Sequence, residues 1–276
     1  MAATLTFENF SFHYQEGDDA LKVTYAKRYG FEIPYRDLTA IDQEVQIKRK
    51  ELYFPHESQS VAERKVDRII DAGLQHLIHR LNGKEVIFID ERSGIPLIGS
   101  GDFGIIDRNT SLLEVKTMTG CNLNCIYCSV DEGKNSKITD YLVDPYYLAQ
   151  VAAERAAAKK HPVEFNINPH GEPLLYPFML ELVEELARIP NCHSISTNTN
   201  GTLLSKEKID QLKAAGLTRI NLSLNTLDPE KNDKLSGGRY PTGHVVEMVE
   251  YCKSIKMAVL LAPVVLPGFN DDPKTD

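Results

Sequence analysis

The sequence predicts an α/β protein with a parallel sheet, preceded by a smaller α+β module. From residue 112 onward, strand-like apolar runs alternate with helical patterns, as they do in the βα units of a parallel sheet. Before that point, one long helical pattern stands between two strand-like runs. The chain of 276 residues is long enough for a large α/β domain and a small second domain. We expect an N-terminal module over residues 1–110 and an α/β domain over residues 111–276.

The composition is that of a globular protein with a sizeable core, since 42% of residues are hydrophobic and 25% are charged. The net charge of −8 argues against non-specific coating of nucleic acid, although a local basic patch could still bind RNA. Five cysteines, three of them clustered, suit a reducing compartment. The N-terminus lacks signal-peptide features, and the longest apolar run, residues 257–266, is too short to span a bilayer. We expect a cytoplasmic protein without a membrane partner.

In the N-terminal module, apolar and polar residues alternate over residues 4–12 and predict a half-buried strand. Residues 60–63 (Ser-Val-Ala-Glu) form a capping box that predicts the start of a helix, and Gly83 suits its end. The apolar face of this helix comprises Val66, Ile69, Ile70, Leu74, Leu77, Ile78 and Leu81. Residues 85–89 predict another strand. No catalytic residue is evident, so we interpret the module as a structural cap or a substrate-selecting domain.

Five predicted strands follow in the α/β domain, separated by four predicted helices. The strands are residues 113–118, 163–168, 194–198, 219–225 and 257–265. The helices are residues 144–160, a segment that ends near Pro190, residues 205–215 and residues 241–255. Asp144 and Ser205 suit helix N-caps, and Gly216 suits a helix end. Five strands are too few for a closed (β/α)8 barrel.

Three cysteines directly after the first of these strands form the most informative motif. Cys121, Cys125 and Cys128 have the spacing C-x3-C-x2-C, which can place three thiolates around one side of an iron–sulfur cube. Most such cubes are held by four cysteines. The other two cysteines, Cys192 and Cys252, are distant in the sequence. One iron would therefore be open, and an open coordination position is where a metal site performs chemistry.

Two simpler interpretations of the cysteines are a structural zinc site and a disulfide with a spare thiol. Zinc requires four nitrogen or sulfur ligands, and the candidate fourth ligands His161 and His170 lack the usual knuckle spacing. A disulfide is less consistent with so few cysteines and with the absence of secretion features. The non-catalytic alternative is therefore a protein that binds zinc or a structural iron–sulfur cluster.

The cysteine spacing, with Tyr127 just before the third cysteine, resembles the signature of the radical S-adenosylmethionine (SAM) superfamily. The resemblance implies a [4Fe–4S] cluster whose open iron binds SAM. One electron from the cluster then cleaves SAM to methionine and a 5′-deoxyadenosyl radical, and Tyr127 packs near the adenine. It also implies a partial (β/α)6-type barrel. Compared with a six-unit barrel, the five predicted strands of this chain imply a barrel that is truncated after its fifth strand.

Motifs after the next two strands extend the resemblance. Residues 168–175 (Asn-Pro-His-Gly-Glu-Pro-Leu-Leu) look like the Gly-Gly-Glu-Pro motif of the superfamily, with His170 in place of the first glycine. That likeness implies that Gly171 and Glu172 bind the amino group of SAM. Residues 197–201 (Thr-Asn-Thr-Asn-Gly) resemble a Thr-Asn-Gly element that lines the SAM pocket, which implies a contact from Asn198.

The last two strands carry further likenesses to the same superfamily. The fourth strand looks like its ribose-binding strand, with Ser223 and Asn225 on one face because side chains alternate with a period of two. The end of the fifth strand, with Val265, resembles the segment that closes over the adenine.

Within the superfamily, residues 112–275 look most like the molybdopterin-precursor cyclase. Residues 219–232, the Gly-Gly-Arg segment at residues 237–239 and the Pro-Gly-Phe-Asn-Asp segment at residues 267–271 point to it. That cyclase has a second cluster from C-terminal cysteines and no long N-terminal module, so its GTP substrate is not carried over.

We therefore expect an enzyme of the oxidoreductase or transferase class with an electron donor of flavodoxin or ferredoxin type. It would modify RNA or protein, or act in cofactor biosynthesis.

Overall fold

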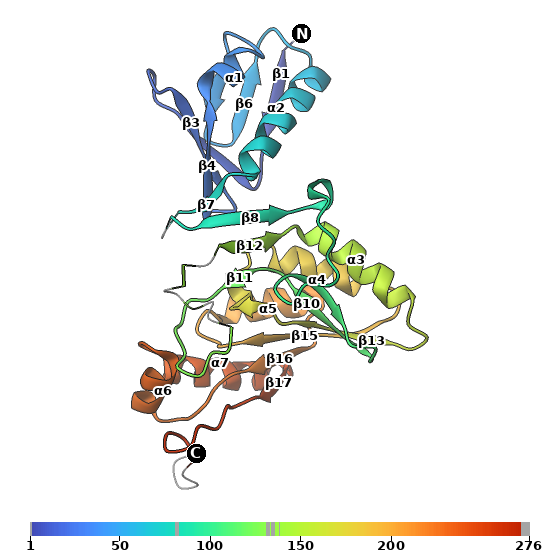
Figure 1. Ribbon diagram of the computed structural model, residues 1–276, viewed down its shortest axis with the longest axis vertical. Helices are drawn as coiled ribbons and strands as arrows, with labels where there is room; N and C mark the ends of the chain where they lie inside the picture. Colours follow the sequence, from blue (N-terminus) through green and yellow to red (C-terminus); the bar gives the residue numbers. More distant parts are fainter. Residues whose placement is uncertain (1, 81–82, 131–132, 134–135, 138, 272–276) are drawn as a thin grey trace. The chain divides into compact units, whose positions relative to one another are not determined.

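The computed structural model describes residues 2–80, 83–130, 133, 136–137 and 139–271. Its contacts divide the chain into two compact units, Met1–Phe88 and Ile89–Asp276, each of which contains strands and helices (Figure 1). None of the helices in the described ranges is long and apolar enough to cross a membrane.

The first unit combines two antiparallel sheets with one long helix. One sheet has the order β1-β6-β5, from β1 (Ala3–Thr6), β5 (Gln46–Lys48) and β6 (Glu51–Phe54). The other runs β8-β7-β4-β3-β2, from β2 (Phe10–His13), β3 (Ala20–Tyr25), β4 (Tyr29–Pro34), β7 (Leu77–His79) and β8 (Glu85–Ile89). The helices are α1 (Tyr35–Thr39) and α2 (Gln59–Leu74). Gly73 of α2 lies directly against the Phe31 ring of β4, where a Cβ atom would be 2.2 Å from the ring.

Several predictions for this unit were wrong. The strand expected over residues 4–12 is interrupted, because the Phe7 amide donates to the Lys50 carbonyl and the chain turns before β2. The helix ends at Leu74, and the apolar residues beyond it form β7. Gly83 instead belongs to the turn after β7, where its amide donates to the His79 carbonyl. Leu81, expected on the helix face, lies outside the described residues.

The second unit contains a six-stranded sheet of order β17-β16-β15-β13-β10-β9. Five strands are parallel, namely β10 (Leu112–Lys116), β13 (Val163–Ile167), β15 (Cys192–Thr199), β16 (Arg219–Leu222) and β17 (Ala258–Leu261). The helices between them are α3 (Pro145–Ala157), α4 (Met179–Ala187), α5 (Lys206–Ala215), α6 (Pro229–Ser236) and α7 (Thr242–Ser254). Shorter elements are η1 (Glu91–Ser93), η2 (Pro173–Leu175), β11 (Thr119–Gly120), β12 (Asp140–Val143) and β14 (His170–Gly171).

The predicted parallel α/β architecture is confirmed, and local capping explains several helix ends. The Asp144 carboxylate accepts hydrogen bonds from two amides of the first turn of α3, and the Ser205 hydroxyl accepts one at the start of α5. Gly216 ends α5 with a φ of +117°. One strand was missed: β9 (Gly104–Asp107) pairs antiparallel with β10. It precedes the predicted boundary at residue 110 but belongs to this sheet.

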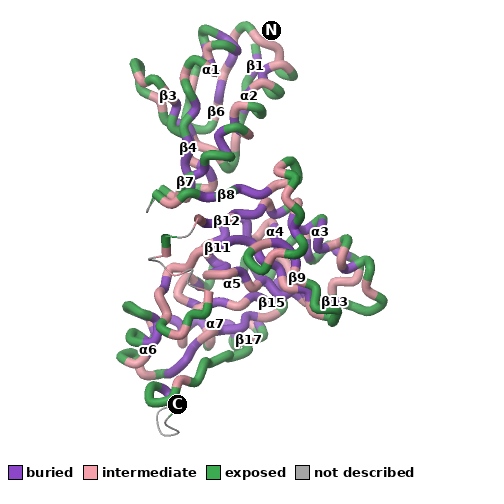
Figure 2. Tube along the Cα trace, in the orientation of Figure 1, coloured by how far each residue is buried: buried purple, intermediate pink, exposed green. Residues whose placement is uncertain are grey.

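The two faces of this sheet differ in chemistry. One face of the sheet carries Val115, Phe165, Ile195 and Ile220, which are at most 1% exposed. Helices α3 and α4 contact β10 and β15 on this face (Figure 2). The opposite face carries the polar residues of the same strands. Their carboxyl ends lead into the loops that form the candidate site.

Candidate active site

The three clustered cysteines lie on one loop at the carboxyl end of β10. β11 leads directly into this loop, residues 121–128, which we call the cysteine loop. Cys121 and Cys125 are partly buried, Cys128 is exposed, and all three are free thiols. The loop therefore presents three unpaired sulfur ligands at the edge of the sheet.

The three cysteines lie close enough for the charge of one to affect the pKa of another. Burial raises the pKa of the Cys121 thiol to about 11, and the charges of Glu172 and Cys125 add to that effect. Burial also raises the pKa of Cys125, with a contribution from the charge of Cys128, while a hydrogen bond from the Tyr127 hydroxyl lowers it. These thiols therefore hold their protons until a positive centre displaces them.

A close approach of two glycines sets the first turn of the cysteine loop. The parallel pairing of β11 with β14 places Gly120 opposite Gly171. Gly171 has a φ of +140°, and a Cβ atom there would lie 1.9 Å from the Gly120 carbonyl oxygen. Only glycine fits such a contact. His170, in place of the first glycine of the superfamily motif, has no positive φ, and its Nδ1 atom lies 3.1 Å from the Asp102 carboxylate.

Glu172 joins two loops through a buried carboxylate. The residue is 1% exposed. Its Oε1 atom accepts hydrogen bonds from the Thr199 hydroxyl at 2.6 Å and the Leu174 amide at 3.0 Å, and Oε2 accepts from the Asn200 amide at 2.8 Å. Burial raises its pKa against the opposing effect of these donors. The carboxylate thus fixes the loop after β13 to the loop after β15.

The loop after β15 also contacts the cysteine loop. The Asn200 side-chain amide donates to the Asn122 side chain at 3.0 Å and lies 4.0 Å from the Cys121 sulfur. The Asn122 amide in turn donates to the Thr202 hydroxyl at 2.8 Å. The buried Tyr240 hydroxyl donates to the Asn200 carbonyl at 2.7 Å, so a fourth segment joins the same cluster.

The end of α6 supports the middle of the cysteine loop. The backbone amides of Asn124 and Ile126 donate to the carbonyls of Ser236 and Leu235, each at 3.0 Å. Gly237 follows with a φ of +68°, and a Cβ atom there would lie 2.0 Å from the Asn124 carbonyl oxygen. The contact therefore requires glycine at the end of this helix.

Tyr127 connects the cysteine loop to the segment after β17. Its hydroxyl accepts a hydrogen bond from the Asn225 side-chain amide at 2.5 Å, and the Asn225 side-chain oxygen accepts from the Val264 amide at 2.9 Å. The buried Asn270 amide donates to both the Asn225 and Val264 carbonyls at 2.8 Å. Val265, expected near the adenine, is 64% exposed.

The strands that lead into these loops carry polar side chains on one face of the sheet. Its hydrogen-bonded network comprises Glu164, Asn166, Ser196, Asn198, Arg219 and Asn221. The Asn198 side-chain oxygen accepts from the amides of Asn166 at 3.1 Å and Asn221 at 2.7 Å. Within the described chain, the Ser223 hydroxyl has no such partner. Asn198 therefore belongs to this network, while Ser223 is available to a ligand.

The loops bring most of the predicted site residues together. Tyr127 bonds to Cys125 and Asn225, and Glu172 holds Asn200, which lies beside Cys121. Gly171 contacts the start of the cysteine loop. Sequence reasoning missed Tyr240, Asn270 and the support from α6. The Gly-Gly dipeptide after α6 was the one local signal of a close backbone approach.

A family comparison agrees with this geometry. Residues 115–275 match the family model of the radical SAM superfamily. The chain belongs to the radical SAM superfamily. Enzymes of this superfamily use a [4Fe–4S] cluster and SAM.

The chain is also similar to several individual proteins. An uncharacterised protein of Methanocaldococcus jannaschii is 37% identical over 87% of this chain and 56% of its own length. The GTP 3′,8-cyclase of Aquifex aeolicus is 31% identical over 60% of this chain and 51% of its own length. A solved structure of anSMEcpe with bound AdoMet is 22% identical over 56% of this chain and 44% of that chain, with a TM-score of 0.46. The chain spans about half the length of the curated relatives it matches.

The donor set of the cysteine loop fits the cluster of the superfamily. Cys121, Cys125 and Cys128 are three free thiols on one loop. A structural zinc site requires four ligands, whereas cysteine thiolates are the ligands that hold a [4Fe–4S] cluster, each on its own iron.

Proposed function

We propose that this chain carries the catalytic core of a radical SAM enzyme, in which Cys121, Cys125 and Cys128 hold a [4Fe–4S] cluster that binds SAM. When bound, the cofactors supply one-electron cleavage of SAM to methionine and a 5′-deoxyadenosyl radical, which abstracts hydrogen from a substrate. The proposal is supported by the contacts that the loop after β15 and the end of α6 make with the cysteine loop. The segment after β13 pairs with β11, which leads into that loop. An electron donor of flavodoxin or ferredoxin type completes the reaction.

In this proposal the remaining site residues position SAM. We assign its amino group to Gly171 and Glu172 and its adenine to Tyr127 and Val265. We assign its ribose to Ser223 and Asn225, with Asn198 in the adjoining polar wall. The Ser223 hydroxyl can bind the ribose without losing a hydrogen bond, because it has no partner in the described structure. Asn225 must first give up its hydrogen bond to Tyr127.

The substrate we propose is polar, because the face of the sheet that leads to the cysteine loop is lined by amide, hydroxyl and charged side chains. Asn166 is 6%, Ser196 0% and Asn221 9% exposed. These groups already pair within the network, so a substrate that reaches this face meets polar rather than apolar side chains. RNA, a protein side chain and a small molecule of cofactor biosynthesis are the candidate classes.

The cluster assignment is tested by anaerobic reconstitution with iron and sulfide, followed by iron analysis and electron paramagnetic resonance. We expect a brown protein with about four irons per chain, and Cys121→Ala, Cys125→Ala and Cys128→Ala variants that each lose the cluster. Cys192→Ala removes a partly buried thiol outside the loop and should retain the iron. A colourless protein with one bound zinc, or full iron content in Cys121→Ala, would instead favour a structural metal site.

A further inference from the structure

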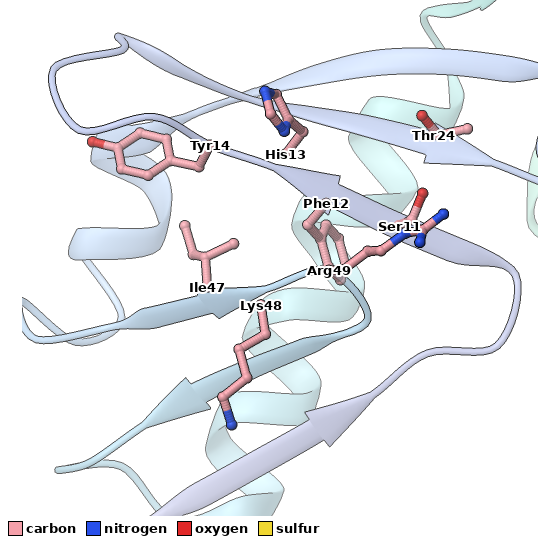
Figure 3. A pocket seen from close by; sticks show the side chains of 8 residues that line it. All are labelled: Ser11, Phe12, His13, Tyr14, Thr24, Ile47, Lys48 and Arg49. Carbon is pink, nitrogen blue, oxygen red and sulfur yellow. The ribbon is translucent and has the colours of Figure 1, made fainter.

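The N-terminal unit has a hollow of about 360 Å³ that the radical chemistry does not use (Figure 3). It lies between β2, β3 and the turn that joins β5 to β6. This volume is at the lower end of the range for small-ligand sites. The question is which chemical group its lining would recognise.

Two hydroxyl groups and an imidazole share one face of the hollow. Ser11 of β2 lies opposite Thr24 of β3 in the antiparallel register, so their side chains point to the same side of the sheet. His13 follows two residues after Ser11 and shares that side, as Figure 3 shows. Phe12 between them is 5% exposed and faces the core. The alternation of side chains along β2 therefore buries Phe12 in the core and turns Ser11 and His13 toward the hollow.

A guanidinium group enters from the neighbouring turn. The Arg49 carbonyl accepts a hydrogen bond from the Phe12 amide at 2.8 Å, and the Lys50 carbonyl accepts one from the Phe7 amide at 3.0 Å. These bonds fix the turn against the start of β2, and the Arg49 side chain extends toward Ser11 in Figure 3. Arg49 is thus positioned by its backbone, and its guanidinium is available to a ligand.

Four polar residues of the hollow are unpaired in the part of the chain that the structure describes. Ser11, His13, Thr24 and Arg49 have no side-chain hydrogen bond or ion pair there. Lys48 is different, because its ammonium is 2.6 Å from the Glu51 carboxylate. No carboxylate is among the lining residues, although the chain has a net charge of −8. The hollow therefore offers hydrogen-bond donors and the positive charge of Arg49, and none of its lining residues is an acid.

We propose that this hollow binds a phosphate group. A guanidinium can donate two parallel hydrogen bonds to phosphate oxygens, while hydroxyls and an imidazole donate to the remaining oxygens. Donors that arrive from two strands and a turn suit a tetrahedral oxyanion better than a planar carboxylate. The group is a phosphomonoester or the phosphodiester of a nucleic acid, which the N-terminal unit would anchor. The proposal does not depend on the cluster or on SAM.

Isothermal titration calorimetry on the full chain without cofactors tests the site with inorganic phosphate, a nucleoside 5′-monophosphate and a short single-stranded oligouridylate. We expect binding that weakens about tenfold or more in Arg49→Ala, since a charge-assisted hydrogen bond is lost. The Ser11→Ala/Thr24→Ala double variant should weaken it by a similar factor. Tighter binding of the monophosphate assigns the site to a monoester, and tighter binding of the oligonucleotide assigns it to a nucleic-acid backbone.

The matched control is Arg64→Ala, an exposed arginine on α2, which packs on the opposite side of this sheet. It removes the same charge from the same unit and should leave binding unchanged. The proposal is overturned if none of the three probes binds, if Arg49→Ala binds them as well as the wild type does, or if Arg64→Ala weakens binding equally. Thermal unfolding of each variant verifies that the exposed substitutions leave the fold intact.

Discussion

Glu172 shows how a single residue organises the candidate site. Its carboxylate accepts three hydrogen bonds from the loops after β13 and β15 while the residue is 1% exposed. A buried carboxylate is tolerated when protein donors replace water. The same bonds hold Asn200 beside Cys121. Loss of this carboxylate should therefore affect both stability and the placement of the loops.

We predict that Glu172→Gln lowers the free energy of unfolding by about 1–3 kcal/mol, because the new NH2 group faces a donor and leaves it unsatisfied. Urea denaturation of the protein without cofactors measures this change. Glu247→Gln is the matched control, since its carboxylate pairs with Lys206 at the surface, and surface pairs contribute little. Equal stability of the two variants would show that the buried hydrogen bonds of Glu172 are unimportant.

At the scale of elements, the end of α6 acts as a support for the cysteine loop. Two backbone hydrogen bonds join them, and Gly237 allows the backbones to approach. Because those bonds use main-chain groups, the side chains of Asn124 and Ile126 are not needed for the contact. The conformation of Gly237 is needed.

We predict that Gly237→Ala displaces the cysteine loop and reduces the iron content after reconstitution. The left-handed conformation alone costs a non-glycine residue about 1–2 kcal/mol, and a Cβ atom would collide with the Asn124 carbonyl. Gly243→Ala is the control, because Gly243 is in helix α7 and a Cβ atom there meets nothing within 4 Å. It should retain iron and unfold at the same or a higher temperature. Full iron content in both variants would contradict the role of α6.

A second element contact predicts a pH dependence. Lys159 follows α3, and its ammonium lies 2.6 Å from the Asp107 carboxylate of β9. This contact holds the pKa of the Asp107 carboxyl below its usual range. The stabilisation is present above the unfolded pKa of about 3.9 and is lost as the pH falls through the lower folded pKa.

Lys159→Met should therefore lower stability at neutral pH and flatten its decline below about pH 4. Acid denaturation followed by circular dichroism measures both effects. Lys160→Met removes the exposed neighbouring charge and should retain the wild-type profile. The same profile in all three proteins would refute the contribution of this ion pair.

A structural feature could be predicted from the sequence where its pattern lies within a short stretch of neighbouring residues. The parallel strands and the position of the cysteine loop after the first of them were predicted correctly, because hydrophobic patterns, caps and cysteine spacing are local. The strands β3 to β6 were missed, since charged residues on their exposed faces obscure the alternation of buried residues such as Leu21 and Val23. The bonds from Tyr240 to Asn200 and from Asn270 to Asn225 join residues 40 and 45 positions apart, and no local pattern indicates them.

At the scale of the whole molecule, the two units carry different chemistry. Every residue of the candidate active site belongs to Ile89–Asp276, and the proposed phosphate site belongs to Met1–Phe88. The proposed phosphate site and the proposed SAM site can therefore be tested separately. Loss of phosphate binding in Arg49→Ala should leave the iron content of the cysteine loop unchanged.

The formation of 5′-deoxyadenosine tests the proposed cleavage of SAM most directly. The protein is reconstituted anaerobically with iron and sulfide, and dithionite and SAM are then added. We expect 5′-deoxyadenosine from the wild type and from Cys192→Ala, and none from Cys125→Ala. Equal formation by Cys125→Ala, or none from a wild-type protein that retains its cluster, would contradict the proposed radical SAM function.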